Sequence, residues 1–559
     1  MRWDNWNYKQ PPAHSECLLT AILEARGFVT PLEQTALLSR GLSRLHDPYK
    51  LAGMDKAVQR IRRAIDAGEH VAIYGDYDAD GLTATALFSD FLRTQGLTCE
   101  TYIPNRLTEG YGLHTAALDQ LAALGVTLII TVDCGVSANA EVAYAAELGV
   151  DVVITDHHRA EGALPDAAAV VDPALPHCTY PEKELAGVGV AFKCVCAIAG
   201  AEHTKELLMR YTDLIALGTV ADMVSLAGEN RTLAAHGLAA ICSSDALRPG
   251  IAALLQKARL RREQFDASGI SFGLAPRLNA AGRMGQADVA LNLLSTQDAT
   301  HAAMLADTLE NLNQTRREIA ARMFSEAMAQ LEQSGYRAGP IILAGEGWHT
   351  GVVGNVASQL NERFCVPVIL LCIEGGSANG SGRSVPDFDL FCAIGATALH
   401  LAAFGGHEQA VGLTLDMENF SAWKIAFLNY YKANAPEHTT KSLEADLAVP
   451  NPNLLTLPQI ELLQELEPCG NGNPAPLLVL EDARITRLFP IGGGKHVKLQ
   501  IQKWGQSYDA VFFGVTMGEL TAAGIKTGTA IDTAYTPQIN EFRGNRTVQL
   551  LVRDLRVRE

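Results

Sequence analysis

Short apolar runs alternate with longer alanine-rich stretches over the first third of the chain. The apolar runs span residues 71–74, 127–132, 152–155 and 168–171, and each is followed by Gly or Asp. Helix-like segments such as 116–124 and 139–148 lie between them. This alternation predicts a doubly wound, mainly parallel α/β sheet. Ligands of such sheets bind beyond the carboxyl ends of the strands.

A long helix is predicted after this sheet. Between residues 300 and 333 apolar side chains recur at three- and four-residue steps, and neither Pro nor Gly interrupts before Gly335. The recurring positions are Leu305, Leu309, Leu312, Ile319, Met323 and Leu331. This length suits a connector between two lobes, and an ordinary core helix is the alternative.

The rest of the chain predicts two further domains. Apolar runs at 340–344 and 367–372, with Gly-rich turns at 375–382 and 405–406, indicate a second α/β lobe. A Pro- and Asn-rich boundary follows at 449–458. Beyond it, short strands without long helices predict a small β-barrel. These strands are 477–480, 497–501, 510–513 and 547–552.

The 559 residues exceed the roughly 250–300 at which a single core stops growing, so several domains are expected. We place an N-terminal segment without a readable motif before a large α/β domain, a connecting helix, a second lobe and a barrel. Their predicted bounds are 1–47, 48–299, 300–337, 338–435 and 440–559.

Composition narrows the class of protein. Lys and Arg number 45 against 62 Asp and Glu, a formal charge of −17, which argues against a protein that coats duplex DNA electrostatically. This charge does not exclude a protein that binds nucleic acid in a narrow channel lined by a few Arg and Lys side chains. No apolar run approaches the roughly 18 residues of a membrane span, and residues 1–10 show no signal segment, so a cytoplasmic location is expected. The 11 cysteines form no CxxC pair and are expected to be reduced.

Three carboxylates follow the first apolar run within five residues: Asp76, Asp78 and Asp80. Such a cluster is costly unless cations neutralise it. A calcium-binding EF-hand loop also begins with this spacing, but it needs a Glu at its twelfth position, where this chain has Leu87. A catalytic metal site at a strand end is therefore the preferred interpretation.

Further ligand-type residues follow other apolar runs. Asp133 follows the apolar run 127–132, Asp156-His157-His158 follows the run 152–155, and Asp222 ends a later apolar stretch. A single Asp of this kind is often only a helix N-cap, but together they point to one sheet edge. Oxygen and imidazole ligands without thiolates suit Mn²⁺ or Mg²⁺, with Mn²⁺ favoured by the histidine. Two such ions can clamp a phosphodiester and generate the nucleophile.

These residues resemble the DHH phosphoesterase family, and within it the RecJ nucleases, from about residue 48 to the end. Asp156-His157-His158 is the family signature, and several further motifs accompany it. They are 104–106 with 109–112, 185–192, 276–283, 348–354, 380–384, 405–407 and 539–546. The resemblance implies a DHH catalytic domain, a DHH-associated domain and an oligonucleotide-binding (OB) barrel.

The resemblance also implies metal ligands. Asp133 bridges two ions; the others are Asp78 on one ion and Asp80, His157 and Asp222 on the second, while His158 faces the scissile phosphate. Asp76 is a further candidate for the first ion, because Tyr74 stands where many family members have a histidine ligand.

The same resemblance implies contacts with DNA. Arg277, Ser381 and Arg383 are expected to bind a terminal 5′-phosphate, and Arg106 is expected to lie nearby on the DNA path. The alternative for residues 381–383 is an exposed turn. Tyr111 is a stacking candidate or a half-buried aromatic, and His407 is a DNA contact or a structural residue. On the barrel, cations that could follow a single strand are Lys495, Lys498, Arg543 and Arg546.

We therefore expect a 5′→3′ exonuclease that degrades single-stranded DNA to mononucleotides with two divalent ions, in DNA repair and recombination. The expected enzyme is monomeric and independent of membranes, with a helicase and a single-strand-binding protein as candidate partners. The alternatives are a DHH phosphatase or oligonucleotide phosphodiesterase, and a catalytically silent replication scaffold.

Overall fold

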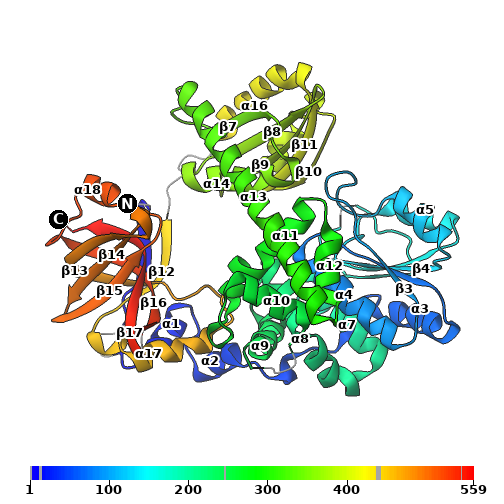
Figure 1. The fold of residues 1–559 in the computed structure, drawn as a ribbon, viewed down its shortest axis with the longest axis horizontal. Helices are drawn as coiled ribbons and strands as arrows, with labels where there is room; N and C mark the ends of the chain where they lie inside the picture. The colour runs from blue at the N-terminus through cyan, green and yellow to red at the C-terminus, as the bar shows by residue number, and fades with distance from the viewer. Residues whose placement is uncertain are drawn as a thin grey trace. The chain divides into compact units, whose positions relative to one another are not determined.

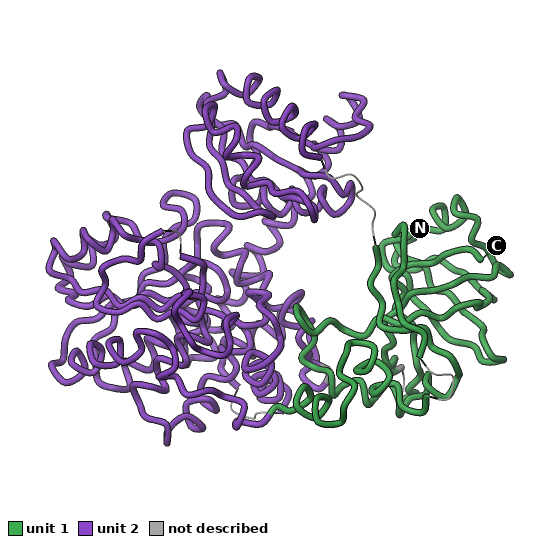
Figure 2. The backbone as a smooth tube through the Cα atoms, turned by 180° about the vertical axis from the view of Figure 1, so that it is seen from behind, with its two compact units in different colours: residues 1–40, 440–559 green, residues 41–439 purple. Residues whose placement is uncertain are grey.

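The computed structural model describes residues 3–11, 15–160, 162–243, 247–435, 442–542 and 544–558. The chain forms two compact units (Figure 2). One comprises residues 41–439, and the other joins residues 1–40 to residues 440–559. No helix of the described residues is long and apolar enough to cross a membrane.

The larger unit begins with a five-stranded sheet whose neighbouring strands are all parallel (Figure 1). In spatial order its strands are β3 (Cys99–Tyr102), β2 (Val71–Tyr74), β4 (Leu128–Val132), β5 (Asp151–Thr155) and β6 (Ala169–Val171). Successive side chains of a strand point to opposite faces. Accordingly, Ile73 and Ile130 belong to one core, and Ala72 and Ile129 belong to another.

Helices cover both faces of this sheet, so the predicted doubly wound architecture is confirmed. One face packs against α3 (Met54–Ala67), α4 (Ala79–Thr94), α7 (Gly187–Ala199) and α8 (Thr204–Ala221). The other packs against α5 (Thr115–Ala123) and α6 (Asn139–Glu147). Further helices complete the domain: α9 (Gly228–Ser243), α10 (Pro249–Ala258), α11 (Ala275–Arg283) and α12 (Ala287–Ser295).

The long helix α13 (Ala299–Gln333) serves two cores. Its first half contributes Ala302, Ala306 and Leu309 to the core of the parallel sheet. Its second half contributes Met323 and Leu331 to the core of the second lobe. The predicted connecting helix is therefore confirmed.

The second lobe is a five-stranded mixed sheet covered by α14 (Thr350–Phe364), α15 (Leu390–Gly395) and α16 (Phe420–Asn434). In spatial order its strands are β10 (Ala403–His407), β11 (Ala410–Asp416), β9 (Ser377–Arg383), β8 (Val368–Glu374) and β7 (Ile341–Glu346). Only β7 and β8 are parallel.

Two predicted turns of this lobe are strands. The Gly-rich stretch 375–382 contains a tight turn only at Gly375 and Gly376, and the rest belongs to β9; Gly405 and Gly406 belong to β10. Glycine is needed within β9 because the sheet is crowded there. A Cβ atom on Gly380 would lie 2.4 Å from a Leu371 methyl carbon. These glycines therefore mark close packing.

The smaller unit contains the predicted barrel. Five strands close on themselves in the order β13 (Leu478–Ile491), β14 (His496–Lys503), β15 (Gln506–Phe512), β17 (Asn545–Val557) and β16 (Ala530–Phe542), since β16 pairs again with β13. This closed five-stranded arrangement is that of an OB-fold. The helices of the unit are α1 (Leu18–Ala25), α2 (Pro31–Leu38), α17 (Leu457–Leu462) and α18 (Met517–Ala522).

Residues 1–40 of the predicted N-terminal segment, which carries no readable motif, are part of this unit, and residues 41–47 belong to the larger one. Strand β1 (Asn5–Lys9) pairs in parallel with β12 (Ser442–Ala448), which in turn pairs with β13 of the barrel. In α1, Leu18 and Ile22 are fully buried in the same core as the barrel strands.

Candidate metal centre

The loop between β2 and α4 holds three carboxylates at the carboxyl end of the sheet. Asp78 is the N-cap of α4, where its Oδ1 accepts the amides of Asp80 (2.9 Å) and Gly81 (3.2 Å). Asp76 is buried, and its Oδ1 has no hydrogen-bond partner. Gly81 is required here because a Cβ would lie 2.6 Å from the carbonyl oxygen of Asp76. The tight fold of the loop therefore brings Asp76 and Asp78 into one group of ligand-type atoms and leaves Asp80 for another.

Asp80 is held from the opposite side by a helix N-terminus. Its two carboxylate oxygens accept the amides of Gly187 (2.6 Å) and Val188 (2.9 Å), the first residues of α7. Helix N-termini favour negative charge. The segment 185–190 thus positions a carboxylate of the cluster.

Asp133 lies at the end of β4 in the left-handed backbone region, with φ at 62°, and is 2% exposed. Asp222 follows α8 as its C-cap. The Nε2 atom of His157 lies 3.0 Å from Oδ1 of Asp133 and 3.8 Å from Oδ2 of Asp222. The ends of β4, β5 and α8 therefore meet at His157.

Asp156 organises the two histidines. One of its oxygens accepts the amides of His157 (2.7 Å) and His158 (3.2 Å) and lies 2.7 Å from Nδ1 of His158; the other accepts the amide of Val136 (2.9 Å). With its oxygens occupied in this way, Asp156 serves as a scaffold. Its contact with Nδ1 fixes the His158 ring.

The ligand-type atoms form three overlapping groups in which all atoms lie within 4.8 Å of one another. The groups are Asp80–His157–Asp222, Asp76–Asp78–Asp133 and Asp133–His157–His158. Asp133 Oδ1 and His157 Nε2 are buried and make no hydrogen bond although they are only 3.0 Å apart. Buried polar atoms normally have partners. Together with Asp76 Oδ1, these buried atoms without hydrogen-bond partners are suited to be ligands of divalent cations.

The raised pKa values of the clustered carboxylates also indicate a site for cations. Burial and the neighbouring carboxylates raise the pKa of Asp76 and Asp133 well above the usual range. Burial raises the pKa of Asp80 to about 6 and that of Asp222 to about 7. Cations at the centre would relieve this repulsion.

The raised pKa values of the carboxylates favour their neutral forms, whereas the raised pKa of His158 favours its charged form. Burial opposes its charge, but the hydrogen bond and the charge of Asp156 outweigh burial and raise the pKa of His158 to about 9. In the metal-free protein His158 therefore holds a proton more readily than an isolated histidine. The hydroxyl of Tyr111 donates to the carbonyl of Asp133 (3.2 Å) and lies 3.2 Å from Nδ1 of His158, so Tyr111 borders the centre.

One acidic residue at this edge is absent from the sequence predictions. Asp172 follows β6 and is fully buried; its Oδ1 accepts the amide of Ala174 (2.6 Å), and its Oδ2 has no partner. Burial raises its pKa to about 7. The sequence contains a signal for Asp172, because this residue, like Asp133 and Asp156, directly follows a predicted strand.

The residues expected to bind a 5′-phosphate come from different elements. Ser381 and Arg383 are on β9, where the guanidinium donates to Ser381 Oγ (2.9 Å) and Ser358 Oγ (3.2 Å). The Arg106 guanidinium lies 4.9 Å from the ring centre of Tyr77. Arg277 on α11 is ion-paired with Glu310 of α13 at 2.5 Å.

The remaining candidates lie on exposed strands. His407 ends β10 and accepts the amide of Gln409 through Nδ1 (3.3 Å). In the barrel, Lys498 pairs with Asp509 at 2.8 Å and Arg546 with Glu461 at 2.7 Å. Arg543 lies outside the described residues.

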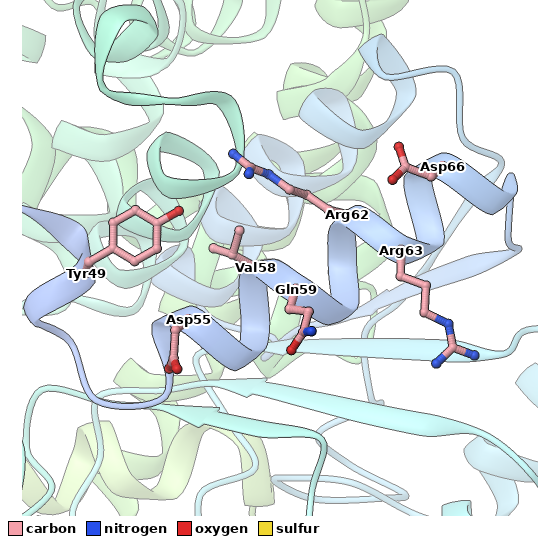
Figure 3. Close-up of a pocket in the computed structure, with 7 residues that line it drawn as sticks. All are labelled: Tyr49, Asp55, Val58, Gln59, Arg62, Arg63 and Asp66. Atoms are coloured by element: carbon pink, nitrogen blue, oxygen red, sulfur yellow. The ribbon is translucent and has the colours of Figure 1, made fainter.

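A surface cavity of about 440 Å³ lies elsewhere, along α3 (Figure 3). It is lined by Tyr49, Asp55, Val58, Gln59, Arg62, Arg63 and Asp66, none of which belongs to the carboxylate cluster. Tyr49 and Arg62 already donate hydrogen bonds to carbonyl oxygens at the end of α7. We therefore place the chemistry at the carboxylate cluster.

Comparison with known proteins agrees with this architecture. Family models match three regions of the chain: the DHH family N-terminal domain at residues 70–219, the DHHA1 domain at 338–431 and the RecJ OB domain at 445–554. The single-stranded-DNA-specific exonuclease RecJ of Bacillus subtilis is 39% identical over 98% of this chain and 69% of its own length. The chain belongs to the RecJ family.

Other members of the RecJ family extend this finding. The Escherichia coli RecJ exonuclease is 35% identical over 97% of this chain and 96% of its own length. The crystal structure of Thermus thermophilus RecJ with Mn²⁺ matches with a TM-score of 0.82 and 30% identity, over 99% of this chain and 80% of that one. A structure of the same protein with Mg²⁺ matches with a TM-score of 0.76 and 28% identity, over 99% of this chain and 79% of that one.

Proposed function

We propose that this RecJ-family chain is a metal-dependent exonuclease that degrades single-stranded DNA from the 5′ end to mononucleotides. The observation that carries the proposal is the group of buried, unpartnered carboxylate and imidazole atoms at the sheet edge. The names of its relatives, which are single-stranded-DNA-specific exonucleases, support the substrate class.

Two divalent ions are proposed at this edge. One is assigned to Asp80, His157 and Asp222 and the other to Asp76 and Asp78, with Asp133 shared between them. Mn²⁺ is the proposed ion because an imidazole nitrogen is among the ligands. When bound, such a pair of ions stabilises the charge that develops on the attacking and leaving oxygens of a phosphodiester.

The chain's own residues supply orientation and charge. The α7 amides fix the Asp80 carboxylate, and Asp156 fixes the His158 ring. His158 is proposed to contact the scissile phosphate, because it borders Asp133 and is partly exposed. Tyr111, which is 49% exposed, is proposed to contact the nucleotide next to it.

The 5′ polarity is proposed to depend on cations beside the metal centre, chiefly Arg106 and Arg383 with Ser381. Arg277 can join them if the phosphate competes with Glu310 for its guanidinium. On the barrel, Lys498 and Arg546, with the undescribed Arg543, are proposed to follow the strand. The proposed setting is DNA repair and recombination in the cytoplasm.

The experiment compares single strands blocked at the 5′ or the 3′ end, in the presence of Mn²⁺, with a duplex of the same sequence as the control. We expect digestion of the 3′-blocked strand, release of mononucleotides and little digestion of the blunt duplex. Digestion that begins at the 3′ end would refute the polarity. Turnover of very short oligonucleotides alone would favour an oligonucleotide phosphodiesterase instead.

A further inference from the structure

The loop between α8 and α9 carries Asp222 in a backbone conformation that its surroundings must hold. Asp222 is the C-cap of α8, and the next residue, Met223, lies in the left-handed region with φ at 62°. A residue with a Cβ rarely adopts this conformation, which persists where neighbouring contacts fix it. The place of the Asp222 carboxylate therefore depends on the contacts that hold this loop.

Asn230, in the first turn of α9, holds this loop. Its side chain is buried, and its Nδ2 donates to the carbonyl oxygens of Ser225 (3.0 Å) and Glu184. Ser225 belongs to the loop of Asp222, whereas Glu184 lies just before α7, the helix whose first amides bind the Asp80 carboxylate. A single amide group therefore ties the loop that carries one ligand to the helix that holds another.

The preceding residue, Glu229, fixes the start of α9 a second time. Its buried carboxylate forms an ion pair with Nζ of Lys193 at 2.5 Å. The same carboxylate accepts the amide of His46 (2.6 Å) and the hydroxyl of Tyr180 (2.5 Å). Lys193 lies in α7 and donates also to the carbonyl of His46 (2.8 Å). The ion pair thus fastens the start of α9 to the same helix α7.

We infer that the contacts between α7 and the start of α9 position two ligands, Asp80 and Asp222, of one proposed metal ion. The positioning residues are Asn230, Glu229 and Lys193, which act through the backbone that carries the two carboxylates. This inference rests on the metal sites of the proposed function. A metal ion binds its ligands at distances that vary by only about 0.2 Å, so a small displacement of the loop lowers the affinity for the ion.

The buried ion pair is better explained by geometry than by stability. Both charges lose their hydration, so a buried pair adds little net stability compared with apolar side chains of the same size. The Glu229 carboxylate nevertheless has three donors, and a network with satisfied hydrogen bonds holds its members in one arrangement. That arrangement sets the separation of the two elements that carry Asp80 and Asp222.

The test measures Mn²⁺ binding to the full chain without DNA, so it does not depend on cleavage. Isothermal titration calorimetry gives the dissociation constants of the wild-type protein and of each variant. We expect Asn230→Ala to weaken the binding of one ion about tenfold or more, as the loss of a contact behind a ligand does. Tyr180→Phe, which removes one hydrogen bond to Glu229, should weaken it about threefold.

Tyr211→Phe is the matched control. Tyr211 is also fully buried and donates its hydroxyl to a carboxylate, that of Asp90 (2.8 Å). It lies about 16 Å along α8 from Asp222, so Mn²⁺ affinity should stay at the wild-type value. A second comparison adds Asn230→Ala to Asp222→Asn. Little further weakening is expected there, because both changes act on the same ligand.

Equal losses of Mn²⁺ affinity in Tyr180→Phe and Tyr211→Phe would overturn the inference, because any weakening of the domain would then suffice. Full additivity of Asn230→Ala with Asp222→Asn would also overturn it. Thermal melting identifies a variant that does not fold, and the two tyrosine variants decide the test if Asn230→Ala is one of them. A protein that shows the expected Mn²⁺ binding but digests no DNA would refute the proposed function and leave the positioning residues supported.

Discussion

Asp133 is the residue on which both proposed ions depend. Its left-handed backbone allows Asp or Asn more readily than other side chains that carry a Cβ. We therefore expect Asp133→Asn to keep the fold but to lower cleavage by roughly a thousandfold or more, since a shared ligand charge is lost.

Cleavage rates in Mn²⁺ and strand binding in chelator test this expectation together. Binding should persist in the variant. Cleavage at the wild-type rate would show that Asp133 is not a metal ligand.

The stability of the metal-free protein should depend on pH through the same cluster. The pKa values of Asp80 and Asp222, raised to about 6 and about 7, mean that the folded state holds protons that the unfolded chain has already released. The free energy of unfolding should therefore fall as pH rises from about 4 to about 7. Bound cations replace these protons.

Melting curves with and without Mn²⁺ at about pH 5 and about pH 7.5 measure this effect. We expect the Mn²⁺-induced rise in melting temperature to be larger at the higher pH. Asp222→Asn should weaken the pH dependence of the metal-free protein. A rise that is equal at both pH values would contradict the assignment.

At the residue scale, the sequence could place the carboxylates but not the contacts of the arginines. Asp78, Asp133 and His157 each follow an apolar run, so the parallel-sheet rule brings them to one edge. Arg283 and Arg316 have no such signal. The residues that they contact depend on which faces of α11 and α13 turn toward the rest of the protein, and that is decided by tertiary packing.

Helix α7 shows how an element positions a ligand. A Cβ on Gly187 would lie 2.6 Å from Oδ1 of Asp133, and the Gly187 amide holds Asp80. We expect Gly187→Ala to displace both carboxylates and to lower kcat on the order of a hundredfold. The rate of strand digestion at saturating Mn²⁺ measures this loss.

Gly189→Ala is the matched control within the same helix. A Cβ there meets only the Leu185 side chain, at 3.5 Å, and alanine in a helix is favoured by about 1 kcal/mol over glycine. Activity should therefore be kept and thermal stability should not fall. If both variants lost activity equally, the loss would come from the helix and not from the contact with Asp133.

Glycine also explains which elements the sequence misassigned. The glycines of β9 and β10 predict turns in the sequence, because composition alone cannot separate a turn from a strand that lies against a crowded neighbour. The helices and the parallel strands were predicted more faithfully, because their apolar periodicity reflects burial directly.

At the scale of the whole molecule, the pairing of β1 with β12 was beyond sequence reasoning. Asn5 pairs with Ser442, and such non-local contacts leave no periodic signal in either segment. Arg26, just after α1, makes an ion pair with Asp446 at 2.8 Å, which ties the N-terminal segment to the barrel unit a second time.

This arrangement predicts that a mutation near the N-terminus acts on the C-terminal barrel. Ile22 is fully buried in the barrel-unit core, so Ile22→Ala should destabilise that unit by about 2–5 kcal/mol. Glu24→Ala, at an exposed position of the same helix, should have little effect. Hydrogen exchange resolved by peptide measures each unit separately.

We expect Ile22→Ala to accelerate exchange in β13–β17 while β2, β4 and β5 remain protected and Mn²⁺ still protects residues near Asp133. Each unit has its own apolar core, so the destabilisation should stay within the barrel unit. Strand binding through the barrel should weaken before the metal-dependent chemistry does. Accelerated exchange confined to residues 41–439 would show that α1 does not stabilise the barrel.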